Sequence, residues 1–227
     1  MMRCGKQTLW VVIVLCLAFG GCGFFRERQE MRSTPEYLYQ RGYELYQDGN
    51  YKEALRFFER LTEQYPLSKY AVLAELGIAD SHFSNGQYAE ADVVYRGFMD
   101  YRPANENLPY VMYQIGLCAY KQMIGIDRDQ SMTMLARESF ELLIARYPQS
   151  QFAFKAEKYL QDCKRRLGEH EFYVGEFYFK QGEYKAALKR FETIQKEYPH
   201  LGLDYKVSYF VHLAKRKLEE AQVSADK

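Results

Sequence analysis

Residues 42–66 read GYELYQDGNYKEALRFFERLTEQYP, and the pattern in this stretch decides the fold. Gly42 stands twelve positions before Ala54, and Gly49 lies between them. After Ala54, an aromatic residue follows at four positions, a large apolar residue three further on and a proline five later. Spacings of three and four place side chains on one face of a helix, and helices usually end before a proline. The stretch therefore predicts two closely approaching helices joined by a glycine turn.

The same pattern occurs four times along the chain. The intervals between successive alanines are 37, 45 and 51 residues, and three of the units also carry a Gly-x-Tyr turn, with the glycines at 49, 86 and 182. A glycine at such a turn can end a helix in the left-handed conformation. The four units are Ala54-Phe58-Leu61-Pro66, Ala91-Tyr95-Phe98-Pro103, Ala136-Phe140-Leu143-Pro148 and Ala187-Phe191-Ile194-Pro199.

Four units in phase resemble the tetratricopeptide repeat, a helix pair of normally about 34 residues. The longer intervals indicate added residues around 123–130 and an amphipathic stretch at 150–166. We expect an all-α, superhelical tetratricopeptide-repeat solenoid over residues 35–222, with about five helix pairs and about ten helices. Its parts are expected near 35–68, 72–105, 109–150 and 168–201, followed by a final helix at 204–222 that covers the open end and a tail at 223–227.

The chain begins with a pattern typical of a secretory signal. Arg3 and Lys6 form a basic region, residues 9–19 are apolar, and Gly20-Gly21 provide a small-residue exit. Eleven apolar residues are too few for a helix that spans a bilayer, which takes about 20. We therefore expect residues 1–21 to be a cleaved signal peptide.

The next residue predicts a lipid anchor. The run AFGGC, which ends at Cys22, resembles the bacterial lipobox, in which the cysteine thiol takes a diacylglycerol before cleavage. More than one acyl chain, palmitate among them, gives durable anchoring, since each buried CH2 contributes about 0.8 kcal/mol. Gly23 stands where Asp retains lipoproteins in the enteric inner membrane. We expect a protein tethered by residues 22–34 to the outer membrane and facing the periplasm.

The charge balance and the cysteine content bear on nucleic-acid binding and on disulfide formation. Once Arg3 and Lys6 are removed from the 31 basic residues, 29 remain against 30 acidic ones. This near-neutral balance gives no sign of nucleic-acid binding. Cys118 and Cys163 are the cysteines that remain in the repeat domain. We expect two buried core thiols, and a disulfide is the alternative, since the sequence does not fix their distance.

Four further sequence strings point to one particular family of tetratricopeptide-repeat proteins. They read PYVMY at 109–113, DRD at 127–129, RYPQSQF at 146–152 and YVGEFYFKQGEY at 173–184. With the repeats, they make nearly the whole mature chain similar to the BamD family of tetratricopeptide lipoproteins. These lipoproteins belong to the BAM complex, the machine that folds β-barrels into bacterial outer membranes. The resemblance implies a scaffold without catalytic activity or cofactor that binds the POTRA region of BamA, other BAM lipoproteins and unfolded barrel precursors.

Aromatic residues occupy the face of the first helices that would line the concave side of the stack. Tyrosine offers a large contact area at small entropic cost, which suits an extended peptide with aromatic side chains. The resemblance implies the C-terminal signal of an unfolded barrel protein as this peptide. Alternatively, the rings pack between repeats. The candidate peptide-binding residues are Tyr39, Tyr43, Tyr46, Phe83, Tyr110, Tyr113 and Tyr120.

One basic residue of the fourth repeat is assigned by the resemblance alone. Arg190 is similar to the family arginine that pairs with a carboxylate of the BamA POTRA domain. A guanidinium fork suits this role better than a lysine does. Without the family, an arginine on a repeat helix is an ordinary solvated residue.

The sequence lacks the motifs of common enzymes. The mature chain contains no Gly-rich phosphate loop, no HExxH zinc helix and no nucleophile elbow. His170 between Glu169 and Glu171 is expected at the surface, because three consecutive helix positions point in different directions. The DRD string at 127–129 is too short for a calcium loop and is expected to cap the following helix or contact a partner.

Other lipoproteins with such repeats provide alternative functions. A pilus-assembly pilotin and a cell-division or peptidoglycan-associated adaptor would show the same fold. We expect those proteins to lack the YVMY string at 110–113 and the long amphipathic stretch that begins at Ser150. A peptidoglycan-binding protein should also show a polar groove suited to sugars.

Overall fold

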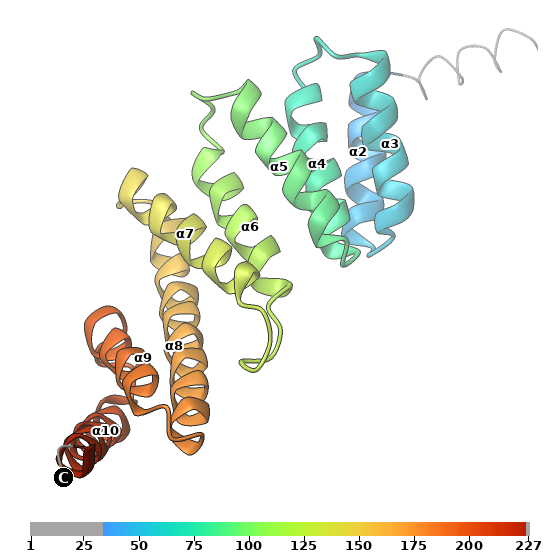
Figure 1. The fold of residues 1–227 in the computed structure, drawn as a ribbon. Helices are drawn as coiled ribbons and strands as arrows, with labels where there is room; N and C mark the ends of the chain where they lie inside the picture. The colour runs from blue at the N-terminus through green and yellow to red at the C-terminus, as the bar shows by residue number, and fades with distance from the viewer. Residues whose placement is uncertain (1–33, 226–227) are drawn as a thin grey trace, which may run out of the picture. The chain divides into compact units, whose positions relative to one another are not determined.

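The computed structural model describes residues 34–225, which form helices in two compact units (Figure 1). Cys22 and the expected signal peptide lie outside these residues. The first unit ends at Gly86, the second begins at Gln87, and within the described residues neither contains a strand. The helices are α2 (Pro35–Gln47), α3 (Tyr51–Gln64), α4 (Ala71–Ser84), α5 (Tyr88–Tyr101), α6 (Leu108–Lys121), α7 (Ser131–Arg146), α8 (Gln151–Lys180), α9 (Tyr184–Glu197) and α10 (Asp204–Ala225).

Three glycines end helices as the sequence predicts. Gly49, Gly86 and Gly182 follow α2, α4 and α8 with φ angles of 77°, 78° and 81°. These angles lie in the left-handed region, which glycine adopts without a steric penalty from Cβ. The Gly-x-Tyr prediction is therefore confirmed at all three turns.

The repeated apolar residues form the core of both units. Each alanine, aromatic and aliphatic residue of the four-fold pattern is at most 3% exposed. The small residues allow this packing, because a Cβ added at Gly42 or Gly77 would lie 2.7 Å from the Phe58 ring. In the last repeat a Cβ at Gly175 would lie equally close to Phe191. The helices therefore approach closely at these small residues, and a large aromatic ring packs against each glycine.

The longest helix corrects the expected helix count. The sequence predicts a stretch at 150–166 and a separate repeat beginning near 168, but α8 runs without a break through 30 residues. Its buried positions, among them Ala156, Leu160, Cys163 and Leu167, continue at spacings of three and four, so one helical stripe serves both segments. The described residues therefore contain nine helices instead of about ten.

The added residues of the third repeat lie where the spacing places them. Residues 122–130 connect α6 to α7 without helical structure, which confirms the predicted insertion. After α9, the final helix α10 packs its Val207 and Val211 against the core that contains Phe191. The result is an all-α tetratricopeptide-repeat fold in which α8 contacts α6, α7 and α9.

Candidate protein-binding surfaces

The tyrosines of α2 connect that helix to α4 within the first unit. Tyr39 stacks on Tyr43, with ring centroids 6.2 Å apart, and on Tyr70 at 5.5 Å. The hydroxyl of Tyr46 forms a 2.9 Å hydrogen bond with Ser84 at the end of α4. Tyr39 and Tyr46 are half-buried, whereas Tyr43 is 48% exposed. We call Tyr39, Tyr43 and Tyr46 the α2 tyrosine patch.

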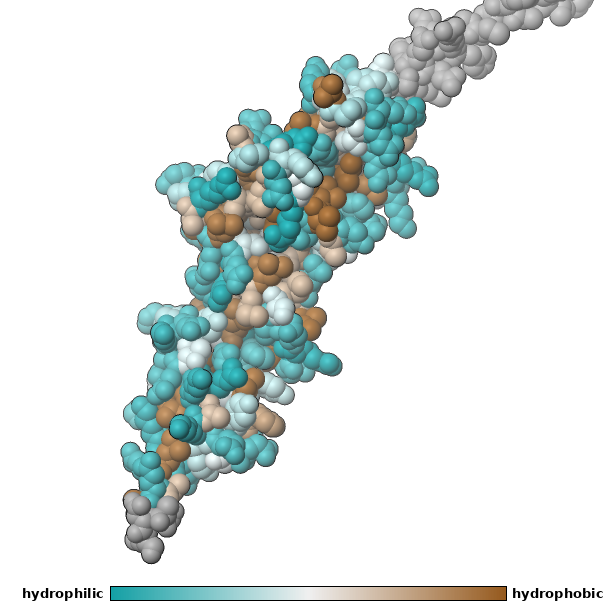
Figure 2. All heavy atoms as spheres, turned by 45° about the horizontal axis from the view of Figure 1, so that its top comes forward, coloured by the Kyte–Doolittle hydropathy of each residue, from teal (hydrophilic) through white to brown (hydrophobic). Residues whose placement is uncertain are grey.

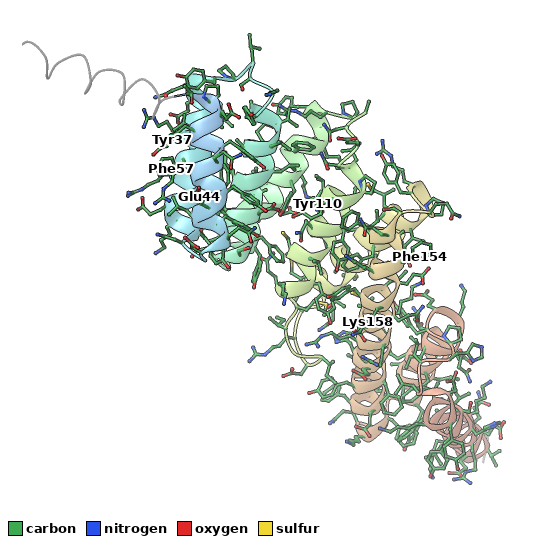
Figure 3. All side chains as sticks on the ribbon, turned by 180° about the vertical axis from the view of Figure 1, so that it is seen from behind. Tyr37, Glu44, Phe57, Tyr110, Phe154 and Lys158 are labelled. Atoms are coloured by element: carbon green, nitrogen blue, oxygen red, sulfur yellow. The ribbon has the colours of Figure 1, made fainter. Side chains whose placement is uncertain are left out.

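The tyrosines of α6 pack in the same way against α8 in the second unit. Tyr113 lies with its ring centroid 5.8 Å from Phe152 and 6.1 Å from Tyr159. Tyr120 contacts Tyr159 at 4.9 Å, and Tyr110, labelled in Figure 3, contacts Phe152 at 5.4 Å. All five rings are half-buried. We call Tyr110, Tyr113 and Tyr120 the α6 tyrosine patch.

Four hydroxyl groups of these patches, those of Tyr39, Tyr46, Tyr113 and Tyr120, remain protonated at neutral pH because their pKa is raised. Burial, with added effects of Tyr159, raises the pKa of Tyr113 to about 12. Burial also raises the pKa of Tyr39, Tyr46 and Tyr120 above the usual value. Neutral hydroxyls can donate hydrogen bonds to backbone carbonyls.

The seven predicted peptide-binding residues are thus divided between the two units. Tyr39, Tyr43, Tyr46 and the half-buried Phe83 belong to the first unit, and the α6 tyrosine patch belongs to the second. Six of the seven are partly covered and Tyr43 is the most exposed. The rings contact neighbouring helices, as the packing alternative requires, and each keeps part of its surface open to solvent. Phe154 and Lys158 of α8, both exposed, are labelled in Figure 3.

The ring partners on α8 were not identified from the sequence. Phe152 and Tyr159 lie seven residues apart in the stretch that the sequence predicts to be amphipathic. A separation of seven places two residues on one face of a helix, so the stretch contained a signal for this contact. Which helix it would face was not visible from the spacing.

Arg190 of α9 forms an ion pair with Glu171 of α8. Its Nη1 donates to both carboxylate oxygens, at 3.1 and 2.9 Å. The arginine side chain is 41% exposed and the glutamate 19%. Glu171 also lines an open cavity of about 390 Å³ together with His170 and Tyr198, so solvent reaches both partners of the ion pair.

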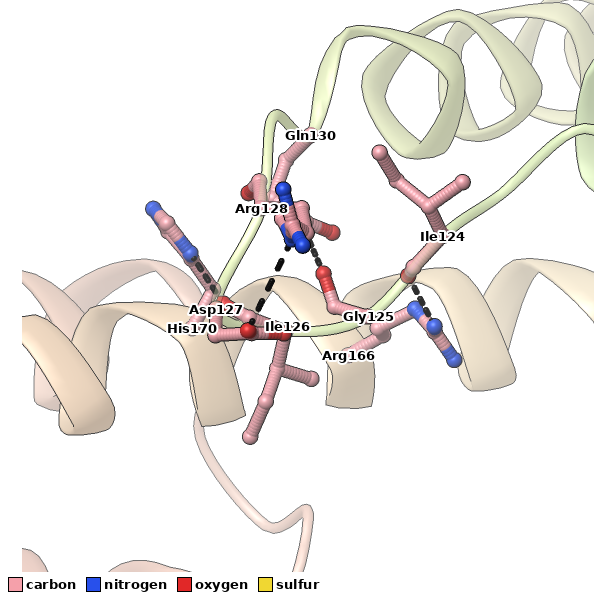
Figure 4. A network of polar contacts seen from close by, with 8 residues as sticks. All are labelled: Ile124, Gly125, Ile126, Asp127, Arg128, Gln130, Arg166 and His170. Carbon is pink, nitrogen blue, oxygen red and sulfur yellow. Dashed lines mark hydrogen bonds and ion pairs between the residues drawn. The ribbon is translucent and has the colours of Figure 1, made fainter.

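The α6–α7 loop is held by a buried amide from within. Gln130, at the end of the loop and 6% exposed, donates from Nε2 to the carbonyls of Gly125 at 2.8 Å and Arg128 at 3.0 Å (Figure 4). Its own carbonyl accepts a 2.8 Å hydrogen bond from Thr133. Asp129, the residue before the N-cap of α7, accepts from the backbone N–H of Ser131 at 2.9 Å, so one carboxylate of the DRD string satisfies an N–H group at the start of α7.

Two side chains of α8 hold the same loop from outside. Arg166 donates from Nη2 to the carbonyl of Ile124, and the Nδ1 of His170 lies 2.6 Å from the carbonyl of Ile126 (Figure 4). A carbonyl only accepts, so Nδ1 carries the proton in this contact. His170 lies at the surface, where it lines the cavity beside Glu171, but its ring is half-buried against the loop and is not fully solvated. Glu171 instead faces α9, so the side chains of His170 and Glu171 point in different directions, as expected for consecutive helix positions.

Both remaining cysteines of the repeat domain are free and buried. Cys118 lies in α6 and Cys163 in α8, and burial raises the pKa of each thiol to about 12. The Cys163 thiol lies 4.0 Å from the sulfur of Met123. The expectation of two core thiols is confirmed.

None of the helices in residues 34–225 has the length and apolar character needed to cross a bilayer. The same residues bring together no group of three or more His, Cys, Asp or Glu side chains that could hold a metal ion. The face seen in Figure 2 shows hydrophobic groups in brown interspersed with hydrophilic groups in teal.

Helix pairs with small residues at the crossings, glycine turns and aromatic surfaces define a tetratricopeptide-repeat protein. Residues 31–226 match the model of the family YfiO, described as outer membrane lipoprotein. The chain belongs to this family.

Relatives in other bacteria carry a more specific name. The chain is 30% identical to the outer membrane protein assembly factor BamD of Rickettsia prowazekii, over 85% of this chain and 76% of that one. It is 29% identical to the protein of the same name from Caulobacter vibrioides, over 84% of this chain and 64% of that one. Among solved structures it is similar to a chain of the "TPR2AB-domain:pHSP90-complex of yeast Sti1", with a TM-score of 0.47 and 15% identity, over 81% and 70% of the two chains.

Proposed function

We propose that this protein is a non-catalytic scaffold of the complex that assembles β-barrel proteins in the outer membrane. The observation that carries the proposal is the family match, which extends through all nine described helices and is accompanied by relatives named as outer membrane protein assembly factors. Lipid on Cys22 would anchor the chain in the outer membrane with the repeats in the periplasm. BamA, other BAM lipoproteins and unfolded barrel precursors are the proposed partners.

The proposed contact with BamA is made by Arg190, whose carboxylate partner on the POTRA domain would complete its hydrogen bonding. Both hydrogen bonds to Glu171 come from Nη1. Nε and Nη2 form no hydrogen bond within residues 34–225, and the side chain is 41% exposed. A guanidinium group has five N–H donors in a planar fork, so it can hold Glu171 and a second carboxylate together. Glu171 would then orient the fork toward the partner.

The proposed contact with barrel precursors is made by the two tyrosine patches. In the first unit, an aromatic C-terminal segment would stack on the exposed ring of Tyr43. In the second unit, such a segment would stack on the half-buried rings of the α6 tyrosine patch. Protonated hydroxyls would donate to the peptide backbone, as the raised pKa of Tyr113 allows. Such contacts tolerate sequence variation, because stacking uses the ring and hydrogen bonds use the main chain.

Co-purification tests the scaffold role. The full chain, tagged and extracted from its own membranes in mild detergent, should recover BamA in near-equal amount. Recovery of pilus or cell-division proteins without BamA would keep the fold and reject the function. Mass spectrometry of the mature N-terminus in the same sample tests the anchor, which requires an acylated Cys22.

Arg190→Glu tests the proposed contact within this assembly. The variant should lose BamA while keeping its helical content by circular dichroism. Arg56→Glu is a matched control, because Arg56 is 74% exposed and also forms an ion pair with one glutamate. Equal recovery of BamA with Arg190→Glu and Arg56→Glu would reject Arg190 as the contact residue.

A further inference from the structure

A second open cavity, of about 240 Å³, lies at the C-terminal half of α8. Three segments that are distant in sequence form it. The α6–α7 loop contributes Ile126, α8 contributes Phe172 and Tyr173, and Leu203 lies directly before α10. Small-molecule sites usually measure about 300–1,000 Å³, so this cavity suits one large side chain better than a metabolite. We call it the α8–α10 cavity.

The walls of the α8–α10 cavity are held in place by contacts within the chain. Hydrogen bonds from Arg166 and His170 fix the loop carbonyls at Ile124 and Ile126. On the opposite wall, the ammonium group of Lys206 lies 4.1 Å from the centroid of the Phe172 ring. A preformed cavity costs little conformational entropy when a partner binds.

Exposed aromatic side chains lie beside the cavity on α8. Tyr173 is 48% exposed and Phe177, one turn later, is 56% exposed. Aromatic residues of this kind are enriched at the centres of protein interfaces and carry much of their binding energy. The cavity and these two rings therefore form one surface suited to a protein partner.

The charges on the rim indicate the chemistry of that partner. Glu169 and Glu176 both line the cavity and lie two helical turns apart on α8. Glu176 is paired with Lys180 at 3.2 Å, whereas Glu169 forms no ion pair within residues 34–225. Lys206, the cation that lines the cavity, has its ammonium group over the Phe172 ring. A cation on the partner would complement the free carboxylate of Glu169.

We propose that the α8–α10 cavity is a docking site for a protein segment with a large apolar or aromatic side chain next to a Lys or Arg. The apolar side chain fills the cavity against Phe172 and Leu203, and the basic residue faces Glu169. This site is separate from the Arg190 contact, because Glu171 and Tyr173 leave α8 in different directions: Glu171 contacts Arg190 of α9, and Tyr173 lines the α8–α10 cavity. It goes beyond the scaffold function and does not require that BamA be the partner.

Site-specific photocrosslinking tests the docking site in the full chain within its own membranes. The photoreactive residue p-benzoylphenylalanine replaces Tyr173, and cells are irradiated before extraction. We expect a discrete crosslinked product whose partner peptide, mapped by mass spectrometry, contains a Lys or Arg next to a large apolar residue. The substitution Glu169→Lys should reduce the yield about tenfold, which corresponds to about 1.4 kcal/mol.

Glu157→Lys is the matched control, since Glu157 is an exposed residue of α8 that forms no ion pair within the described residues. This control should leave the yield unchanged, and circular dichroism should show equal helical content in all variants. The proposal is overturned by the absence of a discrete product, by a mapped peptide without a basic residue, or by a yield that Glu169→Lys does not change. BamA recovered from the same extracts reports on the scaffold function independently.

Discussion

Arg190 and Glu171 form an ion pair between α9 and α8, with Nη1 of the arginine donating to both oxygens of the glutamate at 3.1 and 2.9 Å. Arg190, which we propose to contact BamA, is thus already held by a carboxylate of its own chain. An intramolecular carboxylate can orient a guanidinium group for a second carboxylate, provided that other donors stay free. Mutation can therefore separate the role of Arg190 in binding the partner from the role of Glu171 in orienting Arg190.

Arg190→Ala and Glu171→Gln should differ in their effect on the assembly. Each removes an ion pair whose arginine is 41% exposed, so we expect either to lower the free energy of unfolding by about 1 kcal/mol or less. Arg190→Ala should abolish recovery of BamA, whereas Glu171→Gln should retain most of it. Quantitative mass spectrometry of tagged complexes measures both. Equal loss with the two variants would show that the ion pair acts only through the structure of the chain.

Gly42→Ala should destabilise the first unit. The added Cβ would lie 2.7 Å from the Phe58 ring, which is 2% exposed and whose opposite edge packs closely against Gly77. Overpacking of this kind costs about 1–3 kcal/mol. Gly97→Ala is the matched control, because a Cβ there meets no atom within 4 Å and should stabilise α5 by about 0.5–1 kcal/mol. Thermal unfolding followed by circular dichroism should show opposite shifts, and equal shifts would contradict the close crossing.

Tyr43→Ser and Tyr113→Ser separate peptide binding from packing. Tyr43 is 48% exposed, so its loss should change stability little, whereas Tyr113 contacts Phe140, Phe152 and Tyr159 and its loss should be clearly destabilising. If the α2 tyrosine patch binds peptide, Tyr43→Ser should weaken the affinity for an aromatic C-terminal peptide about tenfold, or about 1.4 kcal/mol. Fluorescence anisotropy measures this affinity. Reduced stability with unchanged affinity in both variants would reject the peptide site.

The two buried thiols should make the protein sensitive to alkaline pH. Burial raises the pKa of Cys118 and Cys163 from 9.0 to about 12 in the folded state. Between these values the unfolded chain loses protons that the folded chain keeps, so stability falls as pH rises. The contribution is fully present below pH 9 and is lost as pH rises through the folded pKa.

The double variant Cys118→Ala, Cys163→Ala tests this dependence. Its melting temperature should fall less steeply than that of the original chain between pH 9 and pH 11. Below pH 8 the two curves should run parallel, since neither thiol titrates there. An identical alkaline slope would show that other groups cause the loss of stability.

The candidate site was only partly accessible from the sequence. The tyrosines of α2 and α6 were found by helical spacing, because the outward face of a helix follows from its period. The α8 partners of the α6 tyrosines, Phe152 and Tyr159, do not follow from the sequence, since spacing within a segment does not reveal which other segment it will face. The His170 contact was missed for the same reason, because its partner Ile126 lies 44 residues earlier.

The sequence by itself determined the helix pairs, their core and their turns. Ala54, Phe58 and Gly49 specify these through spacing and backbone preference, which act over a few residues. Only the tertiary structure decided that α8 is one helix, that Arg190 meets Glu171 and that a cavity opens beside Phe172. These features depend on side chains that chain folding brings together over long sequence distances. Their energies come from packing and from paired charges, and no local pattern encodes which distant residue will be the partner.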